Sequence, residues 1–238
     1  MDRAWQAWGM FTQDGFGVRL EWGIEGVDAL AQHCTVLIVV DVLSFTTSVD
    51  LIVGQGARLA LRAPSAETTG LRRPSDLKSV QAGTEIAFTS PNGGRLCERA
   101  AQRTTVMAGC LRNAAAVADK AIDLADRGPI GVIPAGEQWG VSMHERGKSG
   151  PLRVALEDYI GAGAIVSALL AEGYSPASPE AAFAATSYRT AEPYLAELLG
   201  GCGSGLELGD KGLSEDIALA GQVNVSKATP TLVSGVFQ

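Results

Sequence analysis

The sequence predicts an α/β protein built on a mostly parallel or mixed sheet. Strand-like and helix-like segments alternate along the 238 residues, which are enough for a sizeable core. The run Val-Leu-Ile-Val-Val at residues 36–40 is too short to cross a membrane and rich in β-branched residues. Such a run is typical of a strand buried on both faces, as parallel sheets require. We therefore expect one α/β domain over residues 1–238.

The hydrophobic pattern places the remaining elements in order. Apolar segments predict strands at residues 16–22, 57–61, 86–89, 104–107 and 130–133. Helical spacing predicts helices at residues 26–34, 46–54, 96–101, 114–125, 151–171 and 178–199, with short ones at 204–212 and 214–220. Residues 62–81 are predicted to form a surface excursion with a short helix near 66–72. Edge strands are expected at 223–225 and 231–236.

Composition and charge exclude several classes of function. The net charge of -7 and the absence of a dense basic cluster argue against a nucleic-acid partner. Neither a signal-peptide core nor a membrane-length apolar run is present, so a cytoplasmic protein without a membrane partner is expected. The four cysteines are dispersed and the chain has two histidines, which predicts free thiols and no zinc site.

Four predicted strands end in loops of small or polar residues. The first loop starts at Asp41, and the other three cover residues 90–94, 108–113 and 134–137. Because ligands of open α/β sheets bind beyond the carboxyl ends of the strands, the loops should converge on one rim. The alternative for the first loop is that Asp41 or Ser44 merely caps the following helix.

Two of these loops contain groups that suit an anion. The sequence Ser-Pro-Asn-Gly-Gly at 90–94 offers side-chain donors and closely approaching backbone N–H groups, although it is also a common turn sequence. Arg112 offers a bidentate fork and Asn113 a second donor, the alternative for Arg112 being a solvated charge in a first helical turn. The candidate substrate-binding residues are Ser44, Thr46, Ser90, Asn92, Gly93, Gly94 and Gly109.

Four acids are candidates for metal binding. Asp41, Glu137, Glu157 and Asp158 are hard oxygen ligands, which favour Mg²⁺ over zinc or copper. Glu157 and Asp158 also sit in a nearly all-apolar helix, where an unpaired buried charge is costly. One acid would activate water while the metal and Arg112 stabilise charge, so metal-assisted hydrolysis of a phosphate ester is predicted. The candidate catalytic residues are Asp41, Glu137, Arg112 and Asn113.

Five blocks in this order resemble the 2-phosphosulfolactate phosphatase family. They cover residues 39–50, 89–96, 108–118, 133–139 and 155–169. The resemblance implies a three-layer α/β/α fold and Mg²⁺-dependent hydrolysis of 2-phospho-3-sulfolactate to 3-sulfolactate and phosphate, a step toward coenzyme M. The partner would be a small anionic phosphorylated substrate, and a homodimer is left open. The matching motifs imply that the functional residues are Asp41, Asn92, Arg112, Asn113, Glu137, Glu157 and Asp158.

One departure from the family pattern affects the expected substrate. Family members often have the sequence Asp-Val-Leu-Arg-Ala-Thr-Thr where this chain has Asp-Val-Leu-Ser-Phe-Thr-Thr, so Ser44 replaces an arginine. Losing a bidentate donor changes anion recognition. Two alternatives follow: a phosphatase for another small phosphorylated hydroxy acid, or a non-catalytic binder of an anionic metabolite. The surplus of carboxylates favours the enzyme, because a pure anion receptor gains nothing from them.

Overall fold

A four-stranded parallel sheet forms the centre of the protein. The computed structural model describes residues 11–62, 73–139 and 150–238. The strands lie in the order β1 (Val18–Leu20), β6 (Ile130–Pro134), β2 (Val36–Val40) and β5 (Thr105–Gly109). Every neighbouring pair is parallel. The predicted parallel sheet is therefore confirmed, with the run at residues 36–40 as a central strand.

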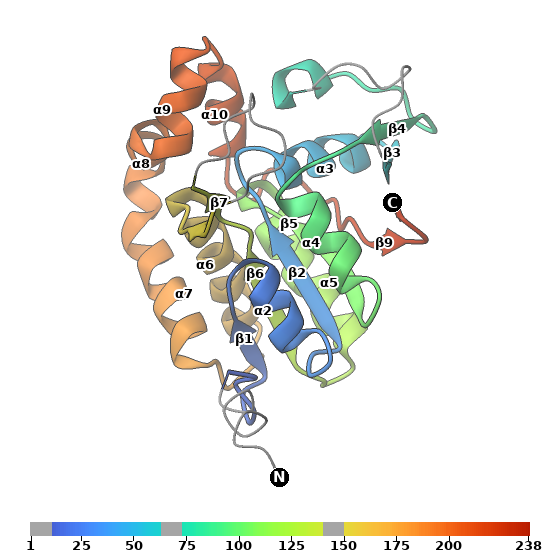
Figure 1. Cartoon of the computed structure of the whole chain (residues 1–238), viewed down its shortest axis with the longest axis vertical. Helices are drawn as coiled ribbons and strands as arrows, with labels where there is room; N and C mark the ends of the chain where they lie inside the picture. The colour runs from blue at the N-terminus through green and yellow to red at the C-terminus, as the bar shows by residue number, and fades with distance from the viewer. Residues whose placement is uncertain (1–10, 63–72, 140–149) are drawn as a thin grey trace.

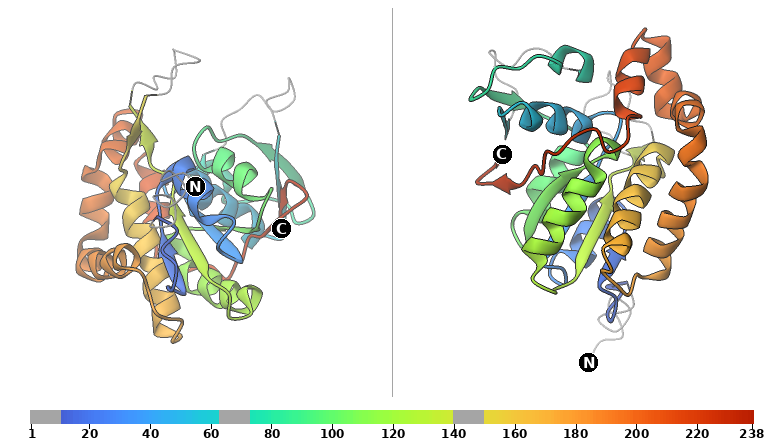
Figure 2. Two further views of the ribbon diagram at one scale, coloured as in Figure 1. Left: turned by 60° about the horizontal axis from the view of Figure 1, so that its bottom comes forward. Right: turned by 180° about the vertical axis from the view of Figure 1, so that it is seen from behind.

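Helices cover both faces of this sheet in three layers (Figures 1 and 2). Helices α2 (Gly23–Leu30) and α4 (Gly93–Ala100) pack on one face. Helices α5 (Ala114–Ala125) and α6 (Leu156–Ala171) pack on the other, and α7 (Pro179–Ala191) lies outside α6. Alternate residues of β2 enter the two cores, which is why every residue of this strand is buried.

A second, smaller sheet lies beside the first. Its strand order is β4 (Glu85–Phe88), β3 (Arg58–Leu61), β10 (Val236–Phe237) and β9 (Leu232–Val233). Strands β3 and β4 are parallel, whereas β10 is antiparallel to both of its neighbours. Helix α3 (Phe45–Gly54) contacts both β5 and β3, so it connects the two sheets. The strand before the 90–94 loop thus belongs to the second sheet.

The remaining elements complete one side of the molecule. A short hairpin pairs β7 (Glu137–Gln138) with β8 (Leu152–Arg153). Helices α8 (Leu195–Gly201), α9 (Gly203–Asp210) and α10 (Ser214–Ala220) follow α7 in the orange and red part of Figure 1. Short 3-10 helices cover Pro74–Leu77, Leu111–Asn113 and Glu192–Tyr194. In the parts of the chain that the structure describes, no helix is both long and apolar enough to cross a membrane.

Several predicted elements differ from the structure. The edge strand expected at 231–236 is instead two strands, β9 and β10, and β10 pairs on both sides, with β3 and β9. The helix expected from residue 151 begins at Leu156, because Leu152–Arg153 pair with β7 as a strand. No strand forms at residues 223–225, because the backbone N–H of Asn224 bonds instead to the carbonyl of Leu111 beyond the sheet. The helix expected at 204–212 spans Gly203–Asp210, and its N-cap is Cys202, whose sulfur accepts the N–H of Gly205. The helix expected near residues 66–72 lies outside the described residues.

Candidate active site

Asp41 lies directly after the carboxyl end of β2, and its carboxylate collects donors from two loops. It accepts the backbone N–H of Gly93 at 2.9 Å and that of Phe45 at 3.2 Å. The Ser90 hydroxyl donates to it at 3.4 Å. The 90–94 loop therefore reaches the rim of the main sheet although it starts from the second sheet.

Asp158, in the first turn of α6, joins the loop after β6 to the loop after β2 at this rim. One of its carboxylate oxygens accepts the N–H of Val42 at 2.8 Å, and the other accepts the N–H of Gly136 at 2.9 Å. Gly161 allows the close approach, since a Cβ there would lie 2.6 Å from the Val42 side chain. With both oxygens engaged by backbone, Asp158 fixes the loops after β2 and β6; its predicted role as a metal ligand stays a prediction.

Glu137 and Glu157 complete the group of acids. Asn92 donates from its side-chain amide to Glu137 at 3.0 Å. Glu157 is 2% exposed, and one of its carboxylate oxygens has no hydrogen-bond partner among the described residues. A buried carboxylate oxygen without a donor is costly, so the site at Glu157 calls for a cation or a ligand.

Burial and neighbouring negative charges raise the pKa values of three of these acids. Burial raises the pKa of Asp41, and the negative charge of Glu157 adds to this, while the N–H groups of Gly93 and Phe45 oppose it. Burial, followed by the charges of Asp41 and Glu157, raises the pKa of Asp158 well above its usual range. Burial and the charge of Asp41 raise the pKa of Glu137 to about 7. A site this rich in crowded carboxylates favours a bound cation.

The acids of this site suit Mg²⁺ without forming a complete set of protein ligands. Among the described residues, no group of three or more acids, histidines or cysteines is arranged to hold a metal ion. Mg²⁺ usually uses one or two carboxylates together with waters and substrate phosphate, so a complete protein cage is not needed. The open oxygen of Glu157 matches that mode, with Asp41 close enough to raise the pKa of Glu137.

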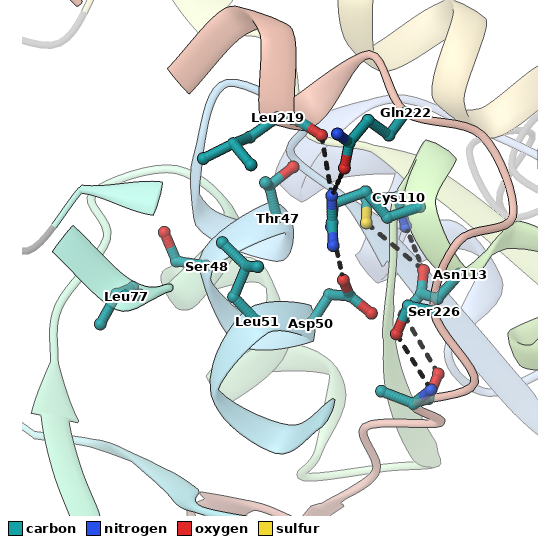
Figure 3. Close-up of polar contacts among 12 residues, drawn as sticks. Thr47, Ser48, Asp50, Leu51, Leu77, Cys110, Asn113, Leu219, Gln222 and Ser226 are labelled. Carbon is teal, nitrogen blue, oxygen red and sulfur yellow. Dashed lines mark hydrogen bonds and ion pairs between the residues drawn. The ribbon is translucent and has the colours of Figure 1, made fainter. Parts of the chain in front are cut away.

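Arg112 lies in a different polar cluster, centred on α3 and the C-terminal segment (Figure 3). Its Nε donates to the buried carboxylate of Asp50 at 2.8 Å. Its Nη1 donates to the Leu219 carbonyl at 3.0 Å and to the Gln222 side chain. These contacts tie the guanidinium into the fold. Among the described residues, Arg112 forms no hydrogen bond to the four acids. The catalytic role predicted for Arg112 stays a prediction.

Several other predicted residues serve the local backbone. Asn113, labelled in Figure 3, accepts the N–H of Cys110 at 2.9 Å and donates to the Ala228 carbonyl at 3.3 Å. The Thr46 hydroxyl accepts the N–H of Asp41 and donates to its carbonyl, which closes the turn after β2. Gly109 is packed against Ile38 and Ile165, where a Cβ would not fit. Ser44 precedes α3, and its carbonyl accepts the Ser48 hydroxyl.

Sequence reasoning missed two residues near the acids. Arg153 faces Glu137 across the β7–β8 hairpin, and its guanidinium lies 5.9 Å from the centre of the Trp139 ring. Cys202 lies near Glu157, and burial together with that negative charge raises the pKa of its thiol to about 11. The strand pairing that places Arg153 here was hidden, because residues 151–171 were assigned to a single helix.

Gly93 offers a first test of this geometry. A Cβ at this position would lie 2.6 Å from the Phe45 ring and 2.8 Å from an Asp41 carboxylate oxygen. We expect Gly93→Ala to displace Asp41, to lower phosphatase activity strongly and to cost about 1–3 kcal/mol of stability. Gly209→Ala in α9 is the control, since a Cβ at that position would meet no atom within 4 Å. Equal activity of the two variants in the same assay would contradict this placement of Asp41.

The pKa of Glu137 predicts how stability depends on pH. The Glu137 carboxyl has a pKa of about 7 in the folded protein and an ordinary value of 4.5 when unfolded. Between these pH values the folded state therefore binds more protons than the unfolded state. Stability of the metal-free protein should therefore fall by about 1–2 kcal/mol as the pH rises from about 5.5 to 8. Thermal melts in EDTA measure this, and Glu137→Gln should lose that part of the slope. An unchanged slope in the variant would refute the assignment.

Comparisons with known proteins identify the family. The family model described as 2-phosphosulpholactate phosphatase matches residues 70–235, well over half of the chain. A protein of Deinococcus radiodurans described as "Probable 2-phosphosulfolactate phosphatase" is 32% identical over 228 residues, which covers 84% of this chain and 88% of that protein. The matched region includes the 90–94 loop, Glu137, Glu157 and Asp158. The chain therefore belongs to the 2-phosphosulfolactate phosphatase family.

Proposed function

We propose that this protein is a Mg²⁺-dependent phosphatase that hydrolyses 2-phospho-3-sulfolactate to 3-sulfolactate and phosphate. The observation that carries the proposal is the convergence of Asp41, Asn92, Glu137 and Glu157 at one rim, with a buried carboxylate oxygen that lacks a donor. In a chain of this phosphatase family, such a site suits a cation and a phosphate ester together.

The roles of the residues follow from their surroundings. Asp41 and Glu157 are proposed to hold Mg²⁺, which when bound neutralises charge on the phosphate. Glu137 has a pKa of about 7, which suits a general base that takes a proton from the attacking water near neutral pH. Asn92 orients Glu137 through its amide. Gly93, at the start of α4, donates its N–H to Asp41 and so holds that carboxylate at the rim.

The identity of the hydroxy acid is the finer part of the proposal. Ser44 stands where an arginine is frequent in the family, so this chain recognises its anion with other groups or accepts a different one. The alternative substrate is another small phosphorylated hydroxy acid. A non-catalytic binder is favoured less, because the clustered acids would repel an anion unless a cation is also bound.

Phosphate release tests the proposal. The purified protein is incubated with 2-phosphosulfolactate and with 2-phospholactate, each with Mg²⁺ and with EDTA. Mg²⁺-dependent release that favours the sulfonate supports both the reaction and the substrate. Release from 2-phospholactate alone supports the phosphatase with a different substrate. No release from either ester would reject the enzyme in favour of the binder.

A further inference from the structure

Arg153 stands directly across from Glu137 in the β7–β8 hairpin. The register pairs Glu137 with Arg153 and Gln138 with Leu152. Residues that face each other in an antiparallel pair project on the same side. Gln138 and Leu152 line a cavity of about 100 Å³ on one side of the hairpin. Arg153 therefore projects on the other side, together with the Glu137 carboxylate.

The guanidinium of Arg153 is held between the hairpin and α9. It lies 5.9 Å from the centre of the Trp139 ring, and its Nη2 donates to the Ser204 hydroxyl at 3.4 Å. A Cβ on Gly203 would lie 3.3 Å from Nη1, so the helix start closely adjoins the arginine. The aromatic contact and the hydroxyl orient the planar fork without neutralising it.

Among the described residues, no direct ion pair neutralises the Arg153 guanidinium, although Glu137 faces it across the hairpin. Among the ion pairs of the described residues, none includes Arg153, whereas Arg112 is paired with the buried Asp50. Arg153 is nevertheless close enough to Glu137 to lower its pKa, against the larger opposing effects of burial and Asp41. An oriented and unpaired guanidinium beside a proposed phosphatase site is suited to bind an anion.

We propose that Arg153 binds an acid group of the substrate other than the phosphate. This inference rests on the proposed function, which places Mg²⁺ at Asp41 and Glu157 and the phosphate beside it. The fork of Arg153 lies on the Glu137 side of that position, where the carboxylate or sulfonate of a hydroxy acid would extend. Arg153 thus supplies a bidentate guanidinium donor, which this chain lacks at position 44, where Ser44 replaces the arginine frequent in the family.

Calorimetric titrations test this role without turnover. 3-Sulfolactate, lactate and inorganic phosphate are titrated separately, with Mg²⁺ present, into the wild type, Arg153→Gln, Arg153→Lys and Arg189→Gln. Arg189 is the matched control, an exposed arginine of α7 that contacts Thr186 of the same helix. We expect Arg153→Gln to weaken 3-sulfolactate binding by about ten- to a hundred-fold, with phosphate binding unchanged. Arg153→Lys should recover part of the affinity, and Arg189→Gln should match the wild type.

Each other outcome has a distinct meaning. A parallel loss of phosphate affinity in Arg153→Gln would overturn the proposal in favour of a phosphate contact. Unchanged 3-sulfolactate binding, or no binding to the wild type, would also overturn it. Loss of lactate binding as well as 3-sulfolactate binding assigns the contact to the carboxylate, and loss of the latter alone assigns it to the sulfonate. If 3-sulfolactate binding depends on Arg153 while phosphate release fails, the reaction is rejected and the anion contact stands.

Discussion

Glu137→Gln should lower kcat by about 10²- to 10⁴-fold while leaving the fold intact. The amide keeps the shape of the side chain and can still accept the N–H of Asn92, which lies at 3.0 Å from the carboxylate. It cannot take a proton from water, so the loss should fall on kcat rather than KM. Steady-state kinetics of phosphate release on purified variant and wild type measure the effect.

A gain in stability should accompany this loss of activity. Because the pKa of Glu137 is about 7, ionising it in the folded protein is unfavourable at pH 8, and the neutral amide removes that cost. The melting temperature at pH 8 should therefore be equal to or above that of the wild type. Glu98→Gln is the control, since Glu98 is exposed on α4. Full activity of Glu137→Gln would remove Glu137 from the mechanism.

Local patterns predicted most of the fold. The buried strand at residues 36–40, the helix at 114–125 and the parallel pairing of the central strands all follow from periodicity and strand composition. The second sheet was not predicted, because the pairing of β3 with the C-terminal β10 joins segments far apart in the chain. The β7–β8 hairpin was missed for a different reason, because two-residue strands carry little pattern of their own.

The candidate site was predicted in part. The predicted group comprises Asp41, Asn92, Arg112, Asn113, Glu137, Glu157 and Asp158. Hydrogen bonds and shared electrostatics place all of these except Arg112 and Asn113 near one another. What the sequence did not reveal is how each donor is used. A strand-end loop can aim its side chains at the rim or back into the fold, and the partners that decide this come from distant segments.

Arg112 shows this distinction most sharply. The loop after β5 reaches the predicted edge, yet the guanidinium turns to Asp50 of α3 and to the segment around Leu219 (Figure 3). Burial raises the pKa of Asp50, and Ser226 and Arg112 counter that shift. The pair links α3 to the C-terminal segment, whose Ser226 N–H also bonds to the Arg112 carbonyl.

Arg112→Met should therefore destabilise the protein by about 3–5 kcal/mol at pH 8, because it leaves the buried Asp50 carboxylate without its counter-charge. That loss corresponds to a drop on the order of 10 °C in melting temperature. The loss should shrink at lower pH, where Asp50 can take up a proton. Thermal and urea melts at both pH values measure the change, and Arg189→Met on the exposed face of α7 is the control.

A double variant separates the structural role of Arg112 from the predicted catalytic one. Asp50→Asn combined with Arg112→Met removes both charges, so it should recover much of the lost stability, and the double-mutant cycle gives the coupling energy. If the double variant is stable and still releases phosphate, Arg112 acts through the fold. If Arg112→Met melts like the wild type but is inactive, the guanidinium contacts substrate, and the catalytic role predicted from the sequence is correct. The ion pair with Asp50 makes the first result the expected one, because a side chain held by a buried carboxylate, a carbonyl and an amide has few donors left for a ligand.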